Sequence, residues 1–179
     1  MVALMRCLLL ALTLPLAALA QGESRPSEAQ IKAAFLYKFG EFVQWPPASF
    51  ARADAPFAIG VMGAEDVAAA LEQLVANRTV QGRPVVVQRV RPGDSLARLH
   101  MLFIGQADAP RLAATLAAAK GQALLTVTES DNALSHGSMI NFVADEQRVR
   151  FDIALASAER GQLKISSRLL AVARRVITS

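Results

Sequence analysis

Short apolar segments alternate with helical stretches through the middle of the sequence. Four segments rich in Val, Ile, Leu, Met and Phe have the length of strands, and they lie at residues 57–63, 84–90, 101–105 and 123–128. Helical patterns separate several of them, at residues 65–76, 95–98 (a short turn) and 109–119. Apolar strands joined by helices are typical of a mostly parallel sheet that is covered on both faces. The sequence therefore predicts an α/β fold with helices on both faces of that sheet.

The pattern changes in the last third of the chain. Two apolar segments there flank a polar turn, at residues 139–143 and 149–153. In the second segment Phe151 and Ile153 alternate with Arg150 and Asp152. Such alternation is typical of a strand with one buried and one solvated face. We therefore expect a C-terminal antiparallel hairpin with Arg150 and Asp152 exposed to solvent.

Helices are predicted at both ends of this region. Ser27 and Gln30 have the spacing of a capping box, which predicts a first helix over about residues 28–39. A short helix is expected over residues 154–160. A final helix is expected from Ser166 or Ser167 to about residue 177, and it would carry Arg168, Arg174 and Arg175.

The first 20 residues have the parts of a secretory signal peptide. Arg6 precedes an apolar stretch, and the stretch ends in Ala18-Leu19-Ala20. We expect cleavage after Ala20 and export to the bacterial periplasm. Residues 21–28 would form a flexible mature N-terminus, and residues 29–179 a single domain.

The sequence offers little catalytic or metal-binding chemistry. The single cysteine, Cys7, lies in the predicted signal peptide, so the mature protein would have no disulfide and no thiol nucleophile. His100 and His136 lie far apart and have no other ligand types near them in sequence. No phosphate loop or nucleophile elbow is present, and no base accompanies Ser138. We therefore expect no enzyme activity, no cofactor and no metal site, and the scattered net charge of +4 does not favour nucleic acid.

Carboxylates follow several of the predicted strands. They are Glu65, Asp66, Asp108, Glu129 and Asp131. The carboxyl ends of parallel strands are where such sheets bind ligands, so these groups could converge on a cation. Acidic residues are also common at helix starts, where they cap free N–H groups. We interpret them as helix-capping residues.

Several motifs resemble the YfiR-like family of periplasmic proteins. They lie at residues 33–39, 45–46, 57–61, 82–85, 99–104, 137–142, 149–153 and 163–170. The resemblance implies a sheet flanked by helices and a regulator rather than a catalyst. The best understood member represses an inner-membrane diguanylate cyclase by binding its periplasmic part, and an outer-membrane lipoprotein relieves that repression. That member is disulfide-bonded, a property that the expected mature chain lacks.

A regulator that acts by protein–protein contact is thus the expected function, with a membrane-bound diguanylate cyclase as the expected target. The alternative is a periplasmic protein that binds a small solute at the carboxyl ends of its strands. The sequence is also compatible with an outer-membrane lipoprotein as a second partner and with a homodimer. The candidate partner contacts are Trp45, Arg150, Asp152 and Arg168. The residues expected to support that surface from the core are Phe151, Ile153 and Leu169.

Overall fold

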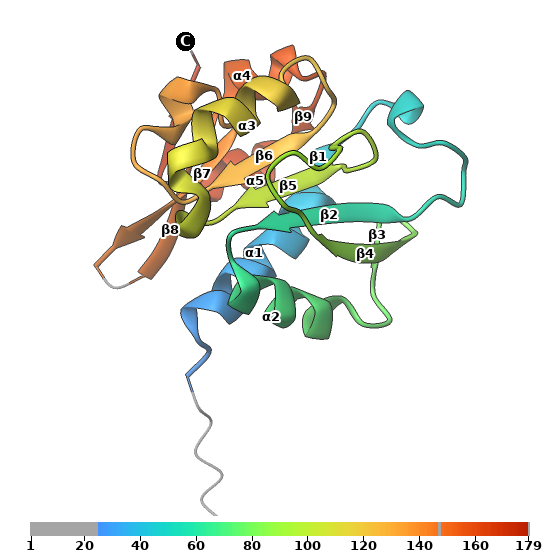
Figure 1. The fold of residues 1–179 in the computed structure, drawn as a ribbon, viewed down its shortest axis with the longest axis horizontal. Helices are drawn as coiled ribbons and strands as arrows, with labels where there is room; N and C mark the ends of the chain where they lie inside the picture. Colours follow the sequence, from blue (N-terminus) through green and yellow to red (C-terminus); the bar gives the residue numbers. More distant parts are fainter. Residues whose placement is uncertain (1–24, 147, 179) are drawn as a thin grey trace, which may run out of the picture.

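A curled eight-stranded sheet forms the centre of the protein, and helices flank it (Figure 1). The computed structural model describes residues 25–146 and 148–178, so the predicted signal peptide lies outside the described residues. The strands of the sheet are β2 (Phe57–Met62), β3 (Thr79–Val80), β4 (Arg83–Arg89), β5 (Met101–Ile104), β6 (Leu125–Thr128), β7 (Ile140–Asp145), β8 (Arg148–Ala154) and β10 (Arg175–Ile177). The α-helices are α1 (Glu28–Phe42), α2 (Glu65–Val75), α3 (Leu112–Ala119), α4 (Leu155–Arg160) and α5 (Ser167–Val172).

Smaller elements complete the chain. The short 3-10 helices are η1 (Pro47–Ser49), η2 (Gln106–Arg111) and η3 (Ala133–His136). A separate two-stranded antiparallel sheet consists of β1 (Val43–Gln44) and β9 (Lys164–Ile165). Within the described part of the chain, no helix is both long enough and apolar enough to cross a membrane.

The sheet is mostly parallel, as the sequence predicts. Its strand order is β10-β8-β7-β6-β5-β2-β4-β3. The strands from β4 to β7 in that order run parallel, whereas β7 and β8 form an antiparallel pair. From β2 the chain first adds β3 and β4 on one side of this strand, and it then crosses to add β5 on the other side. The predicted hairpin is present as β7 and β8. Because this pair is antiparallel and the central strands are parallel, the sheet is mixed.

Both faces of the sheet are covered by helices, with α1 and α2 on one side and α3 on the other (Figure 1). On the α1 face, Phe35 and Phe39 pack against Phe142 and Phe151, with a ring-centroid distance of 5.0 Å between Phe39 and Phe151. On the opposite face, apolar side chains of α3 pack against those of β5. The apolar strands are thus buried on both sides, which is why their sequences are almost continuously hydrophobic.

Aromatic residues close the amino ends of the strands. The imidazole of His100 stacks between Phe50 and Phe57, at centroid distances of 4.4 and 5.2 Å. Its Nδ1 accepts a hydrogen bond from the backbone N–H of Ala58, and burial lowers the pKa of this ring below its usual value. The indole N–H of Trp45 donates to the carbonyl oxygen of His100. Trp45 is therefore a core residue here, only 7% exposed, rather than an exposed contact residue.

The end of the chain differs from the prediction. The last helix ends at Val172 instead of near residue 177, and Arg175–Ile177 forms β10, parallel to β8. The backbone N–H of Arg174 donates to the carbonyl oxygen of Phe151, which starts this pairing. Without β10, the edge of β8 would leave backbone groups unpaired, and the β-branched pair Val176-Ile177 suits a strand.

Several other segments differ from the prediction. Strands β1, β3 and β9 are only two residues long, which is too short for a periodic signal. Residues 95–98 are irregular, with a turn at residues 97–98, rather than helical. The first helix continues to Phe42, three residues beyond its predicted end.

The aromatic cluster yields a stability prediction. Replacing Phe151 by Ala removes a fully packed ring, and the free energy of unfolding should fall by about 3–5 kcal/mol. Urea unfolding of the purified protein measures this loss. The control is Val172→Ala, because Val172 is 59% exposed, and such a surface change should cost less than about 0.5 kcal/mol. Equal, small losses in both variants would show that the ring does not pack as described.

Candidate functional site

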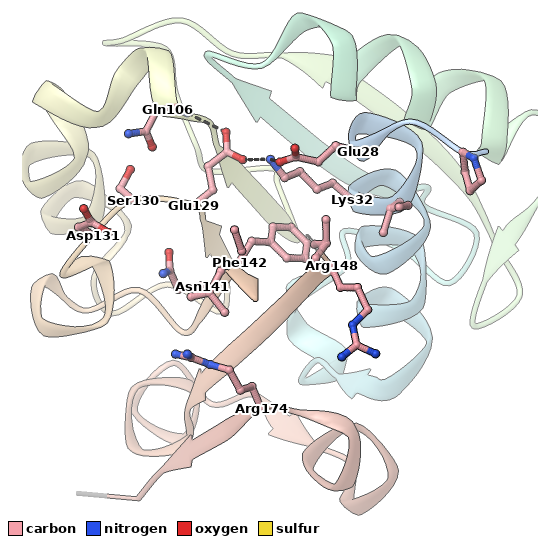
Figure 2. Close-up of a pocket in the computed structure, with 15 residues that line it drawn as sticks. Glu28, Lys32, Gln106, Glu129, Ser130, Asp131, Asn141, Phe142, Arg148 and Arg174 are labelled. Atoms are coloured by element: carbon pink, nitrogen blue, oxygen red, sulfur yellow. Dashed lines mark hydrogen bonds and ion pairs between the residues drawn. The ribbon is translucent and has the colours of Figure 1, made fainter. Parts of the chain in front are cut away.

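An open cleft of about 930 Å³ lies at the carboxyl ends of the central strands. Its walls are the first turn of α1, the segment after β6 and the β7–β8 hairpin (Figure 2). Parallel sheets of this type bind ligands at the same edge. The cleft is therefore the candidate binding site of this fold.

A partly buried ion pair joins two walls of the cleft. The ammonium group of Lys32 on α1 contacts the carboxylates of Glu28, at 2.6 Å, and of Glu129, which follows β6. The side chains of Lys32 and Glu129 are only 13% and 14% exposed. Burial by itself lowers the pKa of Lys32, but the hydrogen bonds to both carboxylates outweigh it and raise that pKa. Lys32 is thereby kept charged, and its ammonium group pairs with two protein carboxylates.

Glu129 does more than pair with Lys32. Its Oε1 accepts a hydrogen bond of 2.8 Å from the backbone N–H of Gln106, the first residue of η2. Glu129 thus caps a helix, but that helix is η2, which precedes Glu129 in the chain instead of following it. Glu65 and Asp66 lie in the first turn of α2, where their charge complements the helix dipole.

A second charge cluster lies where β10 joins β8. The carboxylate of Asp152 accepts two hydrogen bonds from the Arg174 guanidinium, at 2.8 and 2.6 Å, and one from Arg175, at 2.9 Å. Asp152 is only 2% exposed, so the expectation that it lies in solvent is wrong. Burial by itself raises the pKa of Asp152, but the two arginines outweigh it and hold that pKa below its usual value.

A chain of polar side chains runs beneath the cleft beside this cluster. Asn141 on β7 is the cross-strand partner of Asp152, so both side chains lie on the same face of the sheet. The Thr128 hydroxyl donates to Oδ1 of Asn141 at 2.6 Å, and it accepts from the Ser138 hydroxyl at 2.9 Å. These bonds fix the amide of Asn141, which is among the residues that line the cleft (Figure 2).

Comparison with known proteins identifies the family of this chain. A family model described as YfiR/HmsC-like matches residues 29–174. This chain belongs to the YfiR/HmsC-like family. The resemblance seen in the sequence motifs is thereby confirmed. No curated protein matches the chain.

The YfiR/HmsC-like match runs from Ala29 in the first turn of α1 to Arg174, so it includes all the residues that line the cleft except Pro26 and Glu28. This family is known as regulatory rather than catalytic, and membership therefore supports a periplasmic-type regulator. In the part of the chain that the structure describes, no group of three or more His, Cys, Asp or Glu residues is placed to hold a metal ion.

The predicted contact residues of this YfiR/HmsC-like protein lie in different settings. Arg150 is half-buried on β8, and Arg168 is exposed in the first turn of α5. Trp45 and Asp152 are both buried, so neither presents its side chain to solvent. The supporting residues Phe151, Ile153 and Leu169 are buried in the core, as expected.

Sequence reasoning missed Arg174 and Asn141 as members of the cleft. The sequence pattern places Arg174 in the last helix, whereas the buried carboxylate on the neighbouring strand needs a cation. Asn141 stands in an apolar strand, and such a side chain must find hydrogen-bond partners there. The sequence signal for Asn141 is therefore a polar residue at a predicted core position.

The Asp152 cluster predicts how stability changes in acid. Because Arg174 and Arg175 lower the pKa of Asp152 in the folded state, the stabilisation is present above the ordinary aspartate pKa of about 4 and is lost as the pH falls below it. Asp152→Asn should lower the free energy of unfolding at pH 7 by about 1.5–3 kcal/mol. The variant should then lose less stability than the native protein between pH 5 and 3.

Urea unfolding across this pH range measures both effects. Asp54→Asn is the matched control, because the Asp54 carboxylate also pairs with an arginine, Arg52, but is 77% exposed. Such an exposed pair contributes at most about 1 kcal/mol. If Asp152→Asn behaves like Asp54→Asn, the buried cluster does not stabilise the fold.

Proposed function

We propose that this protein is a periplasmic regulator that acts by contact with another protein. Its target is the periplasmic part of an inner-membrane signalling enzyme, and a diguanylate cyclase that it represses is the best candidate. The observation that carries this proposal is the YfiR/HmsC-like match over residues 29–174. An outer-membrane lipoprotein that competes for the same regulator is a second proposed partner. Export through a cleaved signal peptide at residues 1–20 is part of the same proposal.

The charge of the C-terminal region supports a contact of this kind. Residues 148–178 contain seven arginine or lysine residues but only two carboxylates, Asp152 and Glu159. Asp152 is already occupied by two of the arginines. The remaining positive charge fits a partner surface that is acidic, since complementary charges speed association and fix orientation.

Arg150 and Arg168 are the proposed contact residues on this surface. Neither forms an ion pair within the described residues, whose ion pairs involve other cations. Their charges are therefore available to a partner without breaking an internal contact. Phe151 and Leu169, buried next to them in sequence, support the strand and the helix that carry them.

Charge reversal tests this proposal. In a strain that carries the cognate cyclase, the double variant Arg150→Glu with Arg168→Glu should raise cellular cyclic di-GMP, because repression needs the basic surface. The free energy of unfolding should change by less than about 1 kcal/mol, since neither side chain fills the core.

Two controls make the result specific. Arg98→Glu reverses another exposed charge, in the turn before β5, and should leave cyclic di-GMP unchanged. Phe151→Ala reports what loss of the fold alone does in the same strain. A folded double variant with normal cyclic di-GMP would show that this surface does not contact the cyclase.

A further inference from the structure

Strand β4 leaves most of its outer edge open. On its inner side, β2 pairs with residues 85–89. On its outer side, β3 pairs only with Arg83 and Pro84, so no strand of the described residues covers the outer edge at residues 85–89 (Figure 1). We propose that a second copy of this chain covers it, with the two β4 strands antiparallel and Val87 on the two-fold axis. This inference goes beyond the proposed contact with a signalling enzyme, because it assigns a surface for self-association.

The backbone of β4 determines which groups are open. The N–H and C=O groups of one strand residue point to the same side, and that side alternates along the strand. The backbone N–H of Val90 donates to the carbonyl oxygen of Val61 on β2. The even-numbered residues of β4 therefore point these groups toward β2, and the odd-numbered residues Val85, Val87 and Arg89 point theirs outward. A row of outward N–H and C=O groups is a template for another strand.

The sequence of β4 does little to protect this edge. Natural sheets block exposed edges with charged residues, prolines or bulges. Pro84 lies where β3 already pairs, and three half-buried residues that favour strands follow it, Val85, Val86 and Val87. The opposite edge strand, β10, is only three residues long and begins with a charged residue, Arg175. The β4 edge is therefore the one suited to pairing.

The length of the open edge favours a second copy of the same chain. A two-fold axis at Val87 places each Val87 opposite the other, and it places Val85 opposite Arg89 of the other copy. Every outward residue then faces an outward residue, as hydrogen-bonded antiparallel pairs require. Strand β3 covers the edge before Val85, and a turn from Arg91 to Asp94 follows β4. The two open segments therefore cover each other from end to end.

The charges beside the edge are complementary in this orientation. At the carboxyl end of β4, Arg89 pairs with Glu65 and Glu72, which leaves one negative charge in excess. At the amino end, the exposed Arg78 precedes β3 and forms no ion pair within the described residues. An antiparallel pair brings each Arg78 toward the acidic end of the other copy. Opposite charges then meet on both sides of the axis and favour this orientation.

Sedimentation equilibrium of the purified protein tests the association. The native protein should form dimers. Val87→Lys should raise the dissociation constant at least about tenfold, because two like charges would face each other on the axis. Val87→Glu should weaken the dimer for the same reason. An equimolar mixture of the two variants should regain dimers, because opposite charges then meet, and misfolded variants would not show this rescue.

Val172→Lys is the matched control. Val172 is an exposed valine on α5, outside the proposed interface, so this change should leave the dissociation constant as it is in the native protein. A native protein that stays monomeric overturns the proposal, and so does a dimer that both Val87 variants leave intact. If the β4 amides gain protection from hydrogen exchange only when a different protein is added, the edge belongs to that partner and the proposal is also wrong.

A disulfide tests the position of the axis. In a hydrogen-bonded antiparallel pair the two Cα atoms lie about 5.5 Å apart, a distance that a disulfide spans. Val87→Cys in a Cys7→Ser background should therefore form a covalent dimer under mild oxidation. Val172→Cys in the same background should form it much more slowly. Equal rates in the two variants would show that the axis does not lie at Val87.

Discussion

The buried carboxylate of Asp152 connects the features on which the site depends. It lies on β8, an outer strand that follows the antiparallel hairpin, and it is bound by two arginines that follow the last helix. A buried carboxylate without a cation would be strongly unfavourable, so the chain after α5 must return to this strand. That return turns residues 175–177 into β10, covers the edge of β8, and brings Arg174 to the wall of the cleft.

The cleft forms because side chains pack differently at the two ends of the strands. At the amino ends of the strands, Trp45 and His100 are joined by a hydrogen bond and pack with Phe50 and Phe57. At the carboxyl ends, the Lys32–Glu129 ion pair holds α1 against the end of β6 without filling the space beside it. The carboxyl ends of the strands are therefore left open, with charged and polar side chains in the cleft lining.

The sequence predicts the centre of this structure well and its C-terminal part less well. The parallel strands and the hairpin are visible because their apolar patterns are local. The sequence pattern predicts too long a last helix because Arg174 and Arg175 are compatible with a helix, and only the pairing of Arg175–Ile177 with β8 makes that segment a strand. Asp152 was placed in solvent because it alternates with Phe151 and Ile153, whereas its partners lie 22 and 23 positions away.

The central claim is that Asp152 holds the segment after α5 against β8. Hydrogen exchange at the backbone N–H of Arg174, which donates to the carbonyl oxygen of Phe151, tests this claim most directly. NMR exchange rates should show this amide protected in the native protein. In Asp152→Asn it should exchange markedly faster, while the amides of β5 keep their protection, because only the attachment of β10 is weakened. An Arg174 amide that exchanges as fast in the native protein as in an unstructured chain would contradict the account.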